Sequence, residues 1–593
     1  MTAILLNNFS YRISNNLINE VFSSLASFNF NANSNVNTTA DFISCNNVLH
    51  DFKNGDSVIY YTDSSNTTLA GLSNNTLYYV TSANTSGIKL ALANGFTINV
   101  TASIINENGH FIKIQKPNYY FVASKHTEWD DELNPPLPQD NEQALYDFNT
   151  EILFGKRVNE NDLSYMIRKI DWAANTTYNY YDNQANNLYE TDFYVLTASN
   201  NVYKCLYNND GVPSTIEPSQ TTANTFQTGD GYIWKYMYTL SGANNAKFST
   251  NEFIPVDANT LTESAAVNGS IEIVKVENSG SGYIAYANGT ITEVLSNTIF
   301  KLETGNTSTI NGFYDTSSFY IYEGAGNSQL TTISNYVVNS SGHYAVVADP
   351  LNVDITSKYS ITPYISIFGD GTGFKAIPVI DTSSNLYSIS SVIVLNKGQN
   401  YSFANLDIQT AIGYGAGALL RPIMSPKGGH GSNAADELGS TTIAISVPFA
   451  NNEADTISTR NKFRQLALVY DPKLYSNAQL SYTANTFNAL TELGVVTGTI
   501  SFSVNETITG LTTNAHARIS YANSSYMEVT MVDGNFMVSE TIVGEDTSAT
   551  ATISYINNPD IKKFTGEILF LDYFPPVTRS NTTTEVAKLL IGI

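Results

Sequence analysis

Charged residues are scarce in this sequence of 593 residues, at 14% of the chain, whereas a typical soluble domain has about 25%. Basic residues are the scarcest, with 29 Lys and Arg against 53 Asp and Glu, so the formal net charge is −24. Such a surface repels polyanions over most of its area. We therefore expect no nucleic-acid partner and a surface covered largely by neutral polar side chains.

Cysteine and long apolar segments are scarce as well. The two cysteines, Cys45 and Cys205, are far apart and match no zinc, redox or disulfide pattern. No run of 18 or more apolar residues occurs, which predicts no membrane insertion. The N-terminus lacks a basic region followed by a long apolar core, so we expect no signal peptide and synthesis in a cytoplasm-like compartment.

Motifs that carry chemistry are missing too. None of the six histidines falls in an H-x-H, H-E-x-x-H or H-x-x-x-H pattern, and neither G-x-x-x-x-G-K-S/T nor G-x-S-x-G occurs. The pattern G-x-G-x-G begins at Gly369 and again at Gly413, but residues typical of strands follow it, which favours a turn over a dinucleotide site. We expect no cofactor, no metal and no enzymatic activity.

Residues that favour strands and turns dominate what is present. Tyr is abundant, at 38, beside 29 Phe, and short runs rich in Tyr, Thr, Ile and Val alternate with Gly, Ser and Asn. β-Branched and aromatic residues suit pleated strands, and Asn and Gly suit turns. The composition therefore predicts a mainly β protein.

Two internal repeats support this prediction. "IEIVKVENSGSGYIAY" starts at Ile271, and "ISSVIVLNKGQNYSFA" starts at Ile389, 118 residues later. "FSVNETITGLTTNAHARI" starts at Phe502, and "FMVSETIVGEDTSATATI" starts at Phe536, 34 residues later, each reading as strand, turn and strand. Such repeats build β modules that stack their apolar faces.

The stretch "SPKGGHGSNAADELG", Ser425 to Gly439, concentrates Lys, His, Gly and acidic residues, the residue types that are common in binding and catalytic sites. A role in architecture is favoured over catalysis, because the stretch fits none of the site templates. Glycines permit positive φ or close backbone approach, Asn433 can cap a short helix that Gly439 ends, and the histidine can bond backbone carbonyls of the loop. The proposed structural or interface signature consists of Gly428, Gly429, His430, Gly431, Asp436 and Glu437.

Two further clusters are candidate docking patches. "HTEWDDE" places acids around Trp129, including Asp130 and Asp131; a metal site or a glycosidase pair is conceivable, but consecutive acids cannot flank a sugar from two sides. A solvated acidic loop or a patch for a basic partner is favoured.

The densest basic positions are expected to form salt bridges or to meet an acidic neighbour; they are Lys156, Arg157, Arg168 and Lys169.

Several long segments resemble a known family. "NPPLPQDN", "YDFNTEILFGKRVNENDLSYMIRKIDW", "YETDFYVLTASNNVYKCLYNNDGVPSTIEPS", "TGDGYIWKYMYTLS", "KFSTNEFIPV", "SPKGGHGSNAADELG" and "FTGEILFLDYFPPVTRS" occur in this order. Together they are similar to the T4-type phage baseplate wedge subunits of the protein 8 family. The resemblance covers roughly residues 117–490 and the last forty or so residues.

The resemblance implies a non-enzymatic structural protein of the virion tail baseplate, assembled in the host cytoplasm. Family members form homodimers within each wedge of a contractile tail and contact the other wedge subunits. The fold implied is a layered antiparallel β-sandwich core with a few helix-bearing loops. The chain departs from the minimal family pattern at two inserted small β modules, whose surfaces could bind a host-surface glycan.

We expect seven segments along the chain: an N-terminal helix (Ile13–Ala26) and an Asn-rich linker over 1–37, an inserted small β module over 38–115, a first wedge-core segment of helices and strands over 116–265, a second wedge-core segment with repeated β units over 266–440, a third wedge-core segment over 441–495, an inserted tandem β repeat over 496–554, and C-terminal strands completing the core over 555–593.

Two other functions compete with the wedge scaffold. A receptor- or carbohydrate-binding tail protein would act through the inserted modules. A polysaccharide-degrading enzyme would use carboxylates such as Asp130 and Glu132, and it has only generic acids in its favour.

Overall fold

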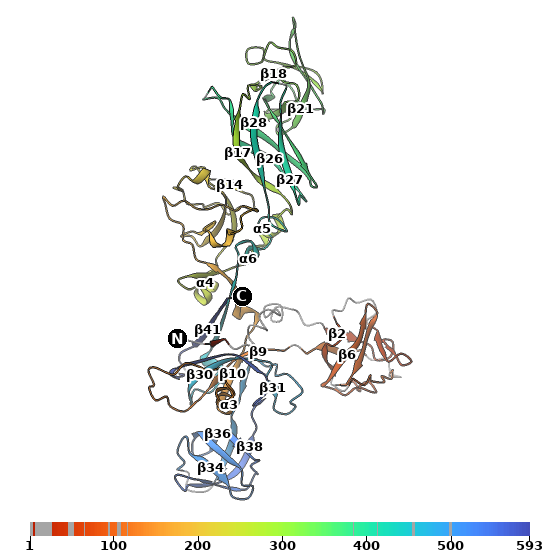
Figure 1. Ribbon diagram of the computed structural model, residues 1–593. Coiled ribbons are helices and arrows are strands. Elements are labelled where there is room, and N and C mark those ends of the chain that lie inside the picture. The colour runs from red at the N-terminus through yellow and green to blue at the C-terminus, as the bar shows by residue number, and fades with distance from the viewer. Residues whose placement is uncertain are drawn as a thin grey trace. The chain divides into compact units, whose positions relative to one another are not determined.

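The computed structural model describes residues 4–5, 27–44, 52–63, 66–92, 95–102, 108–115, 117–383, 385–411, 413–453, 457–496, 501–580 and 582–592. Strands dominate these residues and most sheets are antiparallel, which confirms the mainly β fold (Figure 1). The predicted helix at the N-terminus lies outside the described residues. None of the described helices is long and apolar enough to cross a membrane.

The chain divides into two compact units. One unit comprises Met1–Ser164 together with Ile443–Ile593, and the other is the intervening segment Tyr165–Thr442. The first unit is therefore discontinuous in sequence. It consists of a central sandwich, an N-terminal module and a C-terminal barrel.

The central sandwich is built on a sheet with the strand order β1-β40-β30-β9-β10-β32. Strand β9 is buried on both faces, because Phe121 faces a core shared with β29 and β41 whereas Val122 faces a core shared with Phe148 of helix α3. A layered arrangement follows from this alternation. The bounds are β1 Ile4–Leu5, β9 Tyr119–Ser124, α3 Glu142–Thr150, β10 Ile152–Arg157, β29 Thr442–Phe449, β30 Lys462–Tyr470, β32 Thr486–Asn488, β40 Glu567–Thr578 and β41 Glu585–Gly592.

A proline pair lies inside strand β40. Pro575 and Pro576 do not end the strand, because β40 continues to Thr578. Pairing with β30 shifts register between Phe463↔Val577 and Gln465↔Tyr573, so both prolines lie in an irregular stretch. A bulge tolerates residues that lack a ladder N–H.

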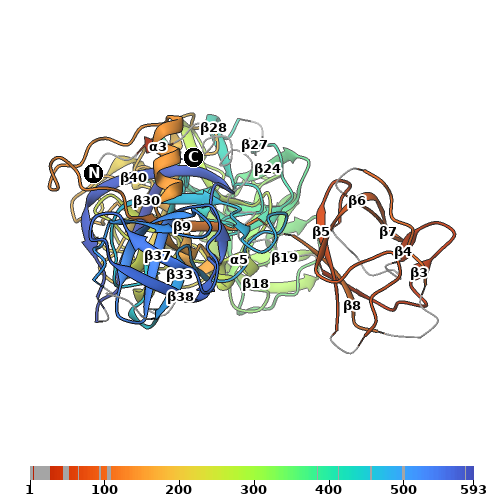
Figure 2. The same cartoon turned by 90° about the horizontal axis from the view of Figure 1, so that it is seen from below.

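The N-terminal module is one curled sheet with the order β2-β8-β5-β6-β7-β4-β3 (Figure 2). The predicted Asn-rich linker is wrong, because Phe28 and Phe30 on β2 belong to the module's core. The amide of Asn31 accepts hydrogen bonds from the backbone of Asn33 and Ser34, at 2.9 and 3.0 Å, and so closes a turn. The bounds are β2 Ser27–Phe30, β3 Val36–Asn37, β4 Phe42–Ser44, β5 Ser57–Thr62, β6 Thr76–Asn84, β7 Gly87–Ala91 and β8 His110–Ile114.

The tandem repeat forms a closed barrel with the order β33-β36-β35-β34-β37-β38. Each copy closes a turn of the other copy. Glu506 accepts from the backbone N–H and hydroxyl of Thr547, at 2.8 and 2.7 Å, and Glu540 accepts from those of Thr513, at 3.2 and 3.0 Å. The bounds are β33 Thr491–Val496, β34 Thr507–Gly510, β35 His516–Ala522, β36 Tyr526–Asp533, β37 Thr541–Gly544 and β38 Thr550–Asn557, so the barrel begins before the predicted boundary.

The second unit contains a sheet with the order β12-β13-β15-β14 whose two faces are both buried. Strand β13 is consequently buried along nearly its whole length. The bounds in this region are β11 Leu163–Arg168, β12 Tyr194–Leu196, β13 Asn201–Tyr207, β14 Phe226–Gln227, β15 Ile233–Thr239, α4 Gly242–Phe248, β16 Phe253–Pro255 and α5 Thr260–Ala265.

The 118-residue repeat falls on strands β17 and β26 of three strand pairs, β17/β28, β25/β26 and β24/β27, which share one core. The copies are joined reciprocally through the backbone. Gly282 N–H donates to Leu386 O and Asn400 N–H donates to Asn268 O, each at 2.7 Å. The bounds are β17 Ile271–Ser281, β24 Tyr364–Gly369, β25 Thr372–Asp381, β26 Ser388–Gln399, β27 Ala404–Gln409 and β28 Ala416–Met424.

A second closed barrel lies between β17 and β24 in the sequence, with the order β18-β19-β22-β21-β20-β23. Its bounds are β18 Ala287–Ser296, β19 Ile299–Leu302, β20 Ser318–Glu323, β21 Leu330–Asn339, β22 Gly342–Val347 and β23 Lys358–Thr362. The remaining short elements of the described chain are η1 Glu160–Asp162, η2 Leu188–Glu190, η3 Asn209–Gly211, α6 Ala434–Glu437, η4 Asn451–Glu453, β31 Lys473–Leu474 and β39 Ile561–Lys562.

Candidate functional site

The stretch Ser425–Gly439 leaves strand β28 and packs its backbone closely against other segments of the second unit. Gly428, Gly429 and Gly431 have φ of 86°, 99° and 92°, as the sequence predicts. A Cβ on Gly429 would lie 2.4 Å from the backbone nitrogen of Val267. Glycine is therefore required here for both conformation and space.

The short helix α6 forms as the sequence predicts. The side chain of Asn433 accepts from the N–H groups of Ala435 and Asp436, at 3.1 and 3.3 Å, and donates to the Asp436 carboxylate at 2.7 Å. Gly439 follows the helix with φ of 70°. Asp436 is therefore part of the cap and is exposed, whereas the next acid in the helix, Glu437, is buried.

That buried acid, Glu437, is 3% exposed and bonded on both carboxylate oxygens. Its Oε1 accepts from the backbone N–H of Gly431 at 2.7 Å and of Asn433 at 3.3 Å. Its Oε2 accepts from the Nζ of Lys204, which comes from strand β13. The carboxylate therefore ties the loop, the helix and the sheet together.

Two lysines lie directly opposite each other in the neighbouring strands of this sheet, Lys204 on β13 and Lys235 on β15. Both are buried, and burial lowers the pKa of each, while Glu437 opposes that effect at Lys204. Lys235 donates to the backbone carbonyl of Ala223 at 2.6 Å. Like charges opposite each other are destabilising, so this pair requires an acid close by.

His430 is 2% exposed and packs edge-on against the ring of Tyr181, at 4.9 Å between centroids. The prediction that it bonds loop carbonyls is not met at Nδ1, which has no hydrogen-bond partner among the described residues and lies 3.9 Å from the Oε2 of Glu437. Burial, and then the nearby charges of Lys204 and Lys235, hold the pKa of His430 well below its usual value. The imidazole is consequently neutral at neutral pH.

Sequence reasoning missed Lys204 and Lys235. The sequence does hold a signal that could have identified them: each lysine stands in the middle of a strand rich in aromatic residues, "VYKCLY" for Lys204 and "YIWKYMYTL" for Lys235. A lysine at a core position is rarely left without an acid partner. That partner, Glu437, belongs to the sequence signature, but its distance along the chain hides the pairing.

The acidic candidate patch is partly internal. Trp129 is only 8% exposed, stacks on Tyr573 at 5.0 Å between centroids and donates from its indole to Phe574 O at 3.1 Å, so its side chain is not a docking surface. Glu132 binds Arg464 through both carboxylate oxygens, at 2.9 and 3.1 Å. Of the remaining acids, Asp131 caps a turn by accepting from Leu133 N–H at 3.0 Å, whereas Asp130 is exposed.

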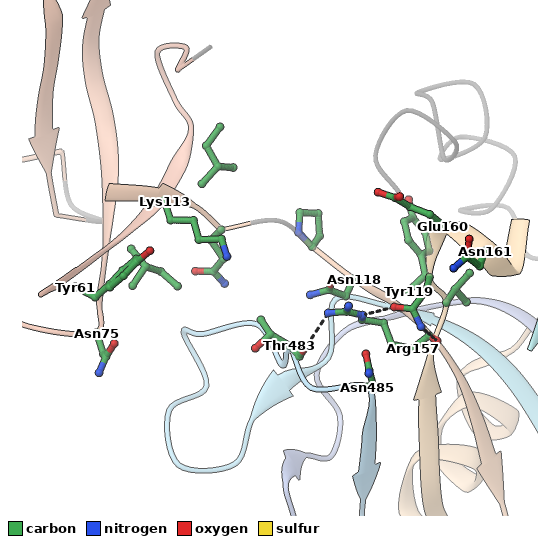
Figure 3. Close-up of a pocket in the computed structure, with 16 residues that line it drawn as sticks. Tyr61, Asn75, Lys113, Asn118, Tyr119, Arg157, Glu160, Asn161, Thr483 and Asn485 are labelled. Atoms are coloured by element: carbon green, nitrogen blue, oxygen red, sulfur yellow. Dashed lines mark hydrogen bonds between the residues drawn. The ribbon is translucent and has the colours of Figure 1, made fainter. Parts of the chain in front are cut away.

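The basic candidates make contacts within the chain. Lys156 pairs with Glu453 at 2.7 Å, Arg168 with Asp192 at 3.2 Å, and Lys169 with Asp171 at 3.2 Å. In Figure 3, Arg157 lies beside Thr483 and Tyr119 in a pocket lining, and its Nη1 donates to Thr483 O at 2.7 Å. Arg168 and Lys169, which share the second unit with the Ser425–Gly439 stretch, pair with acids outside that stretch.

No group of three or more His, Cys, Asp or Glu side chains within the described ranges is arranged to hold a metal ion. Cys205 is buried, and burial raises the pKa of its thiol. A comparison of the sequence with models of protein families finds no match, and a comparison with curated proteins finds none either.

Proposed function

We propose that this chain is a structural subunit of the baseplate wedge of a contractile phage tail, which joins neighbouring wedge proteins and helps to transmit the conformational change on contraction. The observation that carries the proposal is the stretch Ser425–Gly439. It belongs to the segments that resemble the wedge family, and its glycines and acids are used for packing between loop, helix and sheet. That use fits a scaffold role.

The proposal includes the partners implied by the resemblance, namely a second copy of the chain and the other wedge subunits. Exposed tyrosines such as Tyr146, Tyr165 and Tyr189 support it, because such side chains give polar contact area at low entropic cost. The protein would be assembled in the host cytoplasm and kept in the virion. On contraction it would change neighbours mainly as a rigid body.

The first test is the composition of phage particles that encode this chain. Mass spectrometry of washed particles, and of baseplates separated from them, should detect its peptides in both fractions. Sedimentation of the isolated chain, of 64.8 kDa, should give a dimer. Absence of the chain from washed particles contradicts the wedge role, and a monomer at all concentrations contradicts the dimer.

A variant pair tests the stretch itself. Gly429→Ala should fail to restore tail assembly to a phage lacking the gene, because the new Cβ meets the Val267 backbone; the expected loss of stability is about 2–4 kcal/mol. Gly413→Ala is the matched control, since Gly413 has a similar φ of 91° but open space around its Cβ. Equal plating efficiencies for the two variants would contradict a packing role.

A second candidate function is glycan binding by the N-terminal module. Tyr61 on β5 and Phe111 on β8 stack at 4.8 Å with 9° between their planes, and both are partly exposed. Tyr61 lines the same pocket as Asn75 and Lys113 (Figure 3). Aromatic faces with amide and ammonium groups suit sugars. A glycan array should show binding that Tyr61→Ala abolishes and Phe96→Ala, at an exposed site elsewhere in the module, retains.

A further inference from the structure

The amine of Lys204 is completely buried against a carboxylate. In the described part of the chain, its Nζ makes one hydrogen bond, to the Oε2 of Glu437, and lies 4.9 Å from the centroid of the Tyr181 ring. An ammonium group carries three donors. A charged Lys204 would leave two of them without an oxygen acceptor in the interior, which is costly. A group with fewer N–H bonds fits the site better.

One oxygen of the Glu437 carboxylate is bound in the way that an oxyanion hole binds the carbonyl oxygen in acyl transfer. Its Oε1 accepts from two backbone N–H groups, those of Gly431 and Asn433, at 2.7 and 3.3 Å. Two such donors on one oxygen stabilise the negative charge of a tetrahedral intermediate. The other oxygen accepts from Lys204, so the amine is held against the carboxyl group that it would attack.

A group able to move a proton stands beside the oxygen that would leave. The Nδ1 of His430 is 3.9 Å from the Oε2 of Glu437 and has no hydrogen-bond partner in the part of the chain that the structure describes. Burial also lowers the pKa of Lys204 and of His430. The lowered pKa of Lys204 favours its neutral amine, the form that attacks a carbonyl carbon. The lowered pKa of His430 favours its neutral imidazole, the form that accepts a proton.

We propose that Lys204 and Glu437 condense spontaneously to an isopeptide bond, a covalent cross-link between strand β13 and helix α6. A proton passes from Nζ to Oε2 along their hydrogen bond, the resulting neutral Nζ attacks Cδ, and Oε1 takes the negative charge. The C–Oε2 bond then breaks. Oε2 leaves as water with its own proton and one proton from Nζ, which His430 relays. The step is a condensation without change of oxidation state, and it needs no co-reactant.

Other lysine–glutamate pairs lack this combination and serve as internal controls. Lys156 pairs with Glu453 at 2.7 Å, and Lys397 pairs with Glu272 at 3.1 Å, but the side chain of Lys156 is 12% exposed and that of Lys397 is 32% exposed. Water can reach these partly exposed amines and competes with condensation. We expect a cross-link at Lys204 and ordinary ion pairs at the other two lysines.

The test uses the unmodified full-length protein. Its intact mass under denaturing conditions should be lower than the sequence mass by about 18 Da, one water. Trypsin should not cleave after Lys204, and the digest should contain a branched peptide that joins residues 170–235 to residues 428–460. Cleavage after Lys156 should be normal. The full sequence mass together with complete cleavage after Lys204 would overturn the proposal.

Two variants separate the chemistry from the fold. Lys204→Met should have its full sequence mass and yield the two peptides unlinked. His430→Gln should still cross-link but about 100-fold more slowly, the smaller end of the contribution of general acid–base catalysis, as followed by intact mass over time after synthesis. Cross-linking of His430→Gln at the wild-type rate would overturn the proton-relay role of His430.

Discussion

In the C-terminal barrel, the two copies of the repeat are joined by side chains, because Glu506 and Glu540 each bind the turn of the other copy. In the strand pairs β17/β28 and β25/β26, the copies are joined by the backbone, because Gly282 and Asn400 donate to carbonyls that precede the other copy. Both regions are internal duplications with reciprocal contacts. They differ in the chemical group that makes the contact.

This difference determines which substitutions each region tolerates. A carboxylate that serves two N–H groups and a hydroxyl has no substitute of equal geometry, so the barrel depends on two particular acids. Backbone contacts survive a change of side chain, but they require chains to approach closely. Glycines provide that approach: a Cβ on Gly371 would lie 2.4 Å from the ring of Tyr401, and one on Gly415 would lie 2.3 Å from the ring of Tyr283.

The largest expected effect comes from removing a barrel carboxylate. Glu506→Ala leaves the N–H groups of Asp546 and Thr547 without their acceptor. We expect a loss of about 3–4 kcal/mol in barrel stability, and the same for Glu540→Ala if the copies are equivalent. Native-state hydrogen exchange of peptides from residues 501–557 in the full chain measures it.

The control for these variants is Glu545→Ala, since the Glu545 side chain is 52% exposed. Its effect should stay within about 0.5 kcal/mol. A large loss for Glu506→Ala with none for Glu540→Ala would show that the two copies are not equivalent.

The next effect in size comes from adding one methyl group beneath each tyrosine. Gly371→Ala places a Cβ against Tyr401 and should cost about 2 kcal/mol through overpacking. Gly415→Ala meets Tyr283 and also has φ of 114°, so about 3 kcal/mol is expected. Thermal unfolding and hydrogen exchange of β17–β28 peptides give both values. Equal losses would mean that the clash alone matters.

A smaller effect separates the two tyrosines. The hydroxyl of Tyr283 accepts from Ala418 N–H at 3.1 Å, whereas the described residues give the hydroxyl of Tyr401 no such bond. Tyr283→Phe should therefore cost about 1 kcal/mol, and Tyr401→Phe should be nearly neutral. Chemical denaturation of the two variants side by side measures the difference, and equal stabilities would contradict it.

The smallest effect is a dependence of barrel stability on acid. Burial alone would raise the pKa of Glu506, but hydrogen bonds from Thr547 and neighbouring N–H groups outweigh it, and the pKa is lowered. A carboxylate with a lowered folded-state pKa stabilises the fold above its unfolded pKa of about 4.3, and this stability is lost as the pH falls below that value. Exchange of barrel peptides between pH 5 and 3, corrected for the intrinsic rate, should reveal the loss, and Glu506→Gln should lack it.

Much of this architecture could be predicted from local patterns. Repeated residues such as Ile271 and Ile389 identify equivalent strands, and Asn433 followed by Ala434 through Glu437 identifies a capped turn of helix, because both signals depend on neighbours in sequence. The glycine-rich character of the Ser425–Gly439 stretch likewise predicts positive φ. These features need no knowledge of distant partners.

Contacts between distant segments could not be predicted in the same way. Lys204 and Glu437 are buried as a pair only because strand β13 and helix α6 meet in the fold. The acids around Trp129 in the sequence suggest that it is exposed, yet its indole N–H donates to the carbonyl of Phe574, which lies 445 positions away. The barrel β18–β23 has no repeat in its sequence, so nothing local distinguishes it from its surroundings.

The discontinuity of the first unit has a consequence for synthesis. Strand β9 pairs with β30 through contacts such as Tyr120↔Val469, and residues 165–442 are translated between them. At about 5–20 residues per second, the first strands of the sandwich wait roughly 15–60 s for their partner strands. During this interval the apolar faces of β9 and β10 are exposed, and the second unit can complete its own core. Chaperone demand for this chain should therefore be greatest midway through translation.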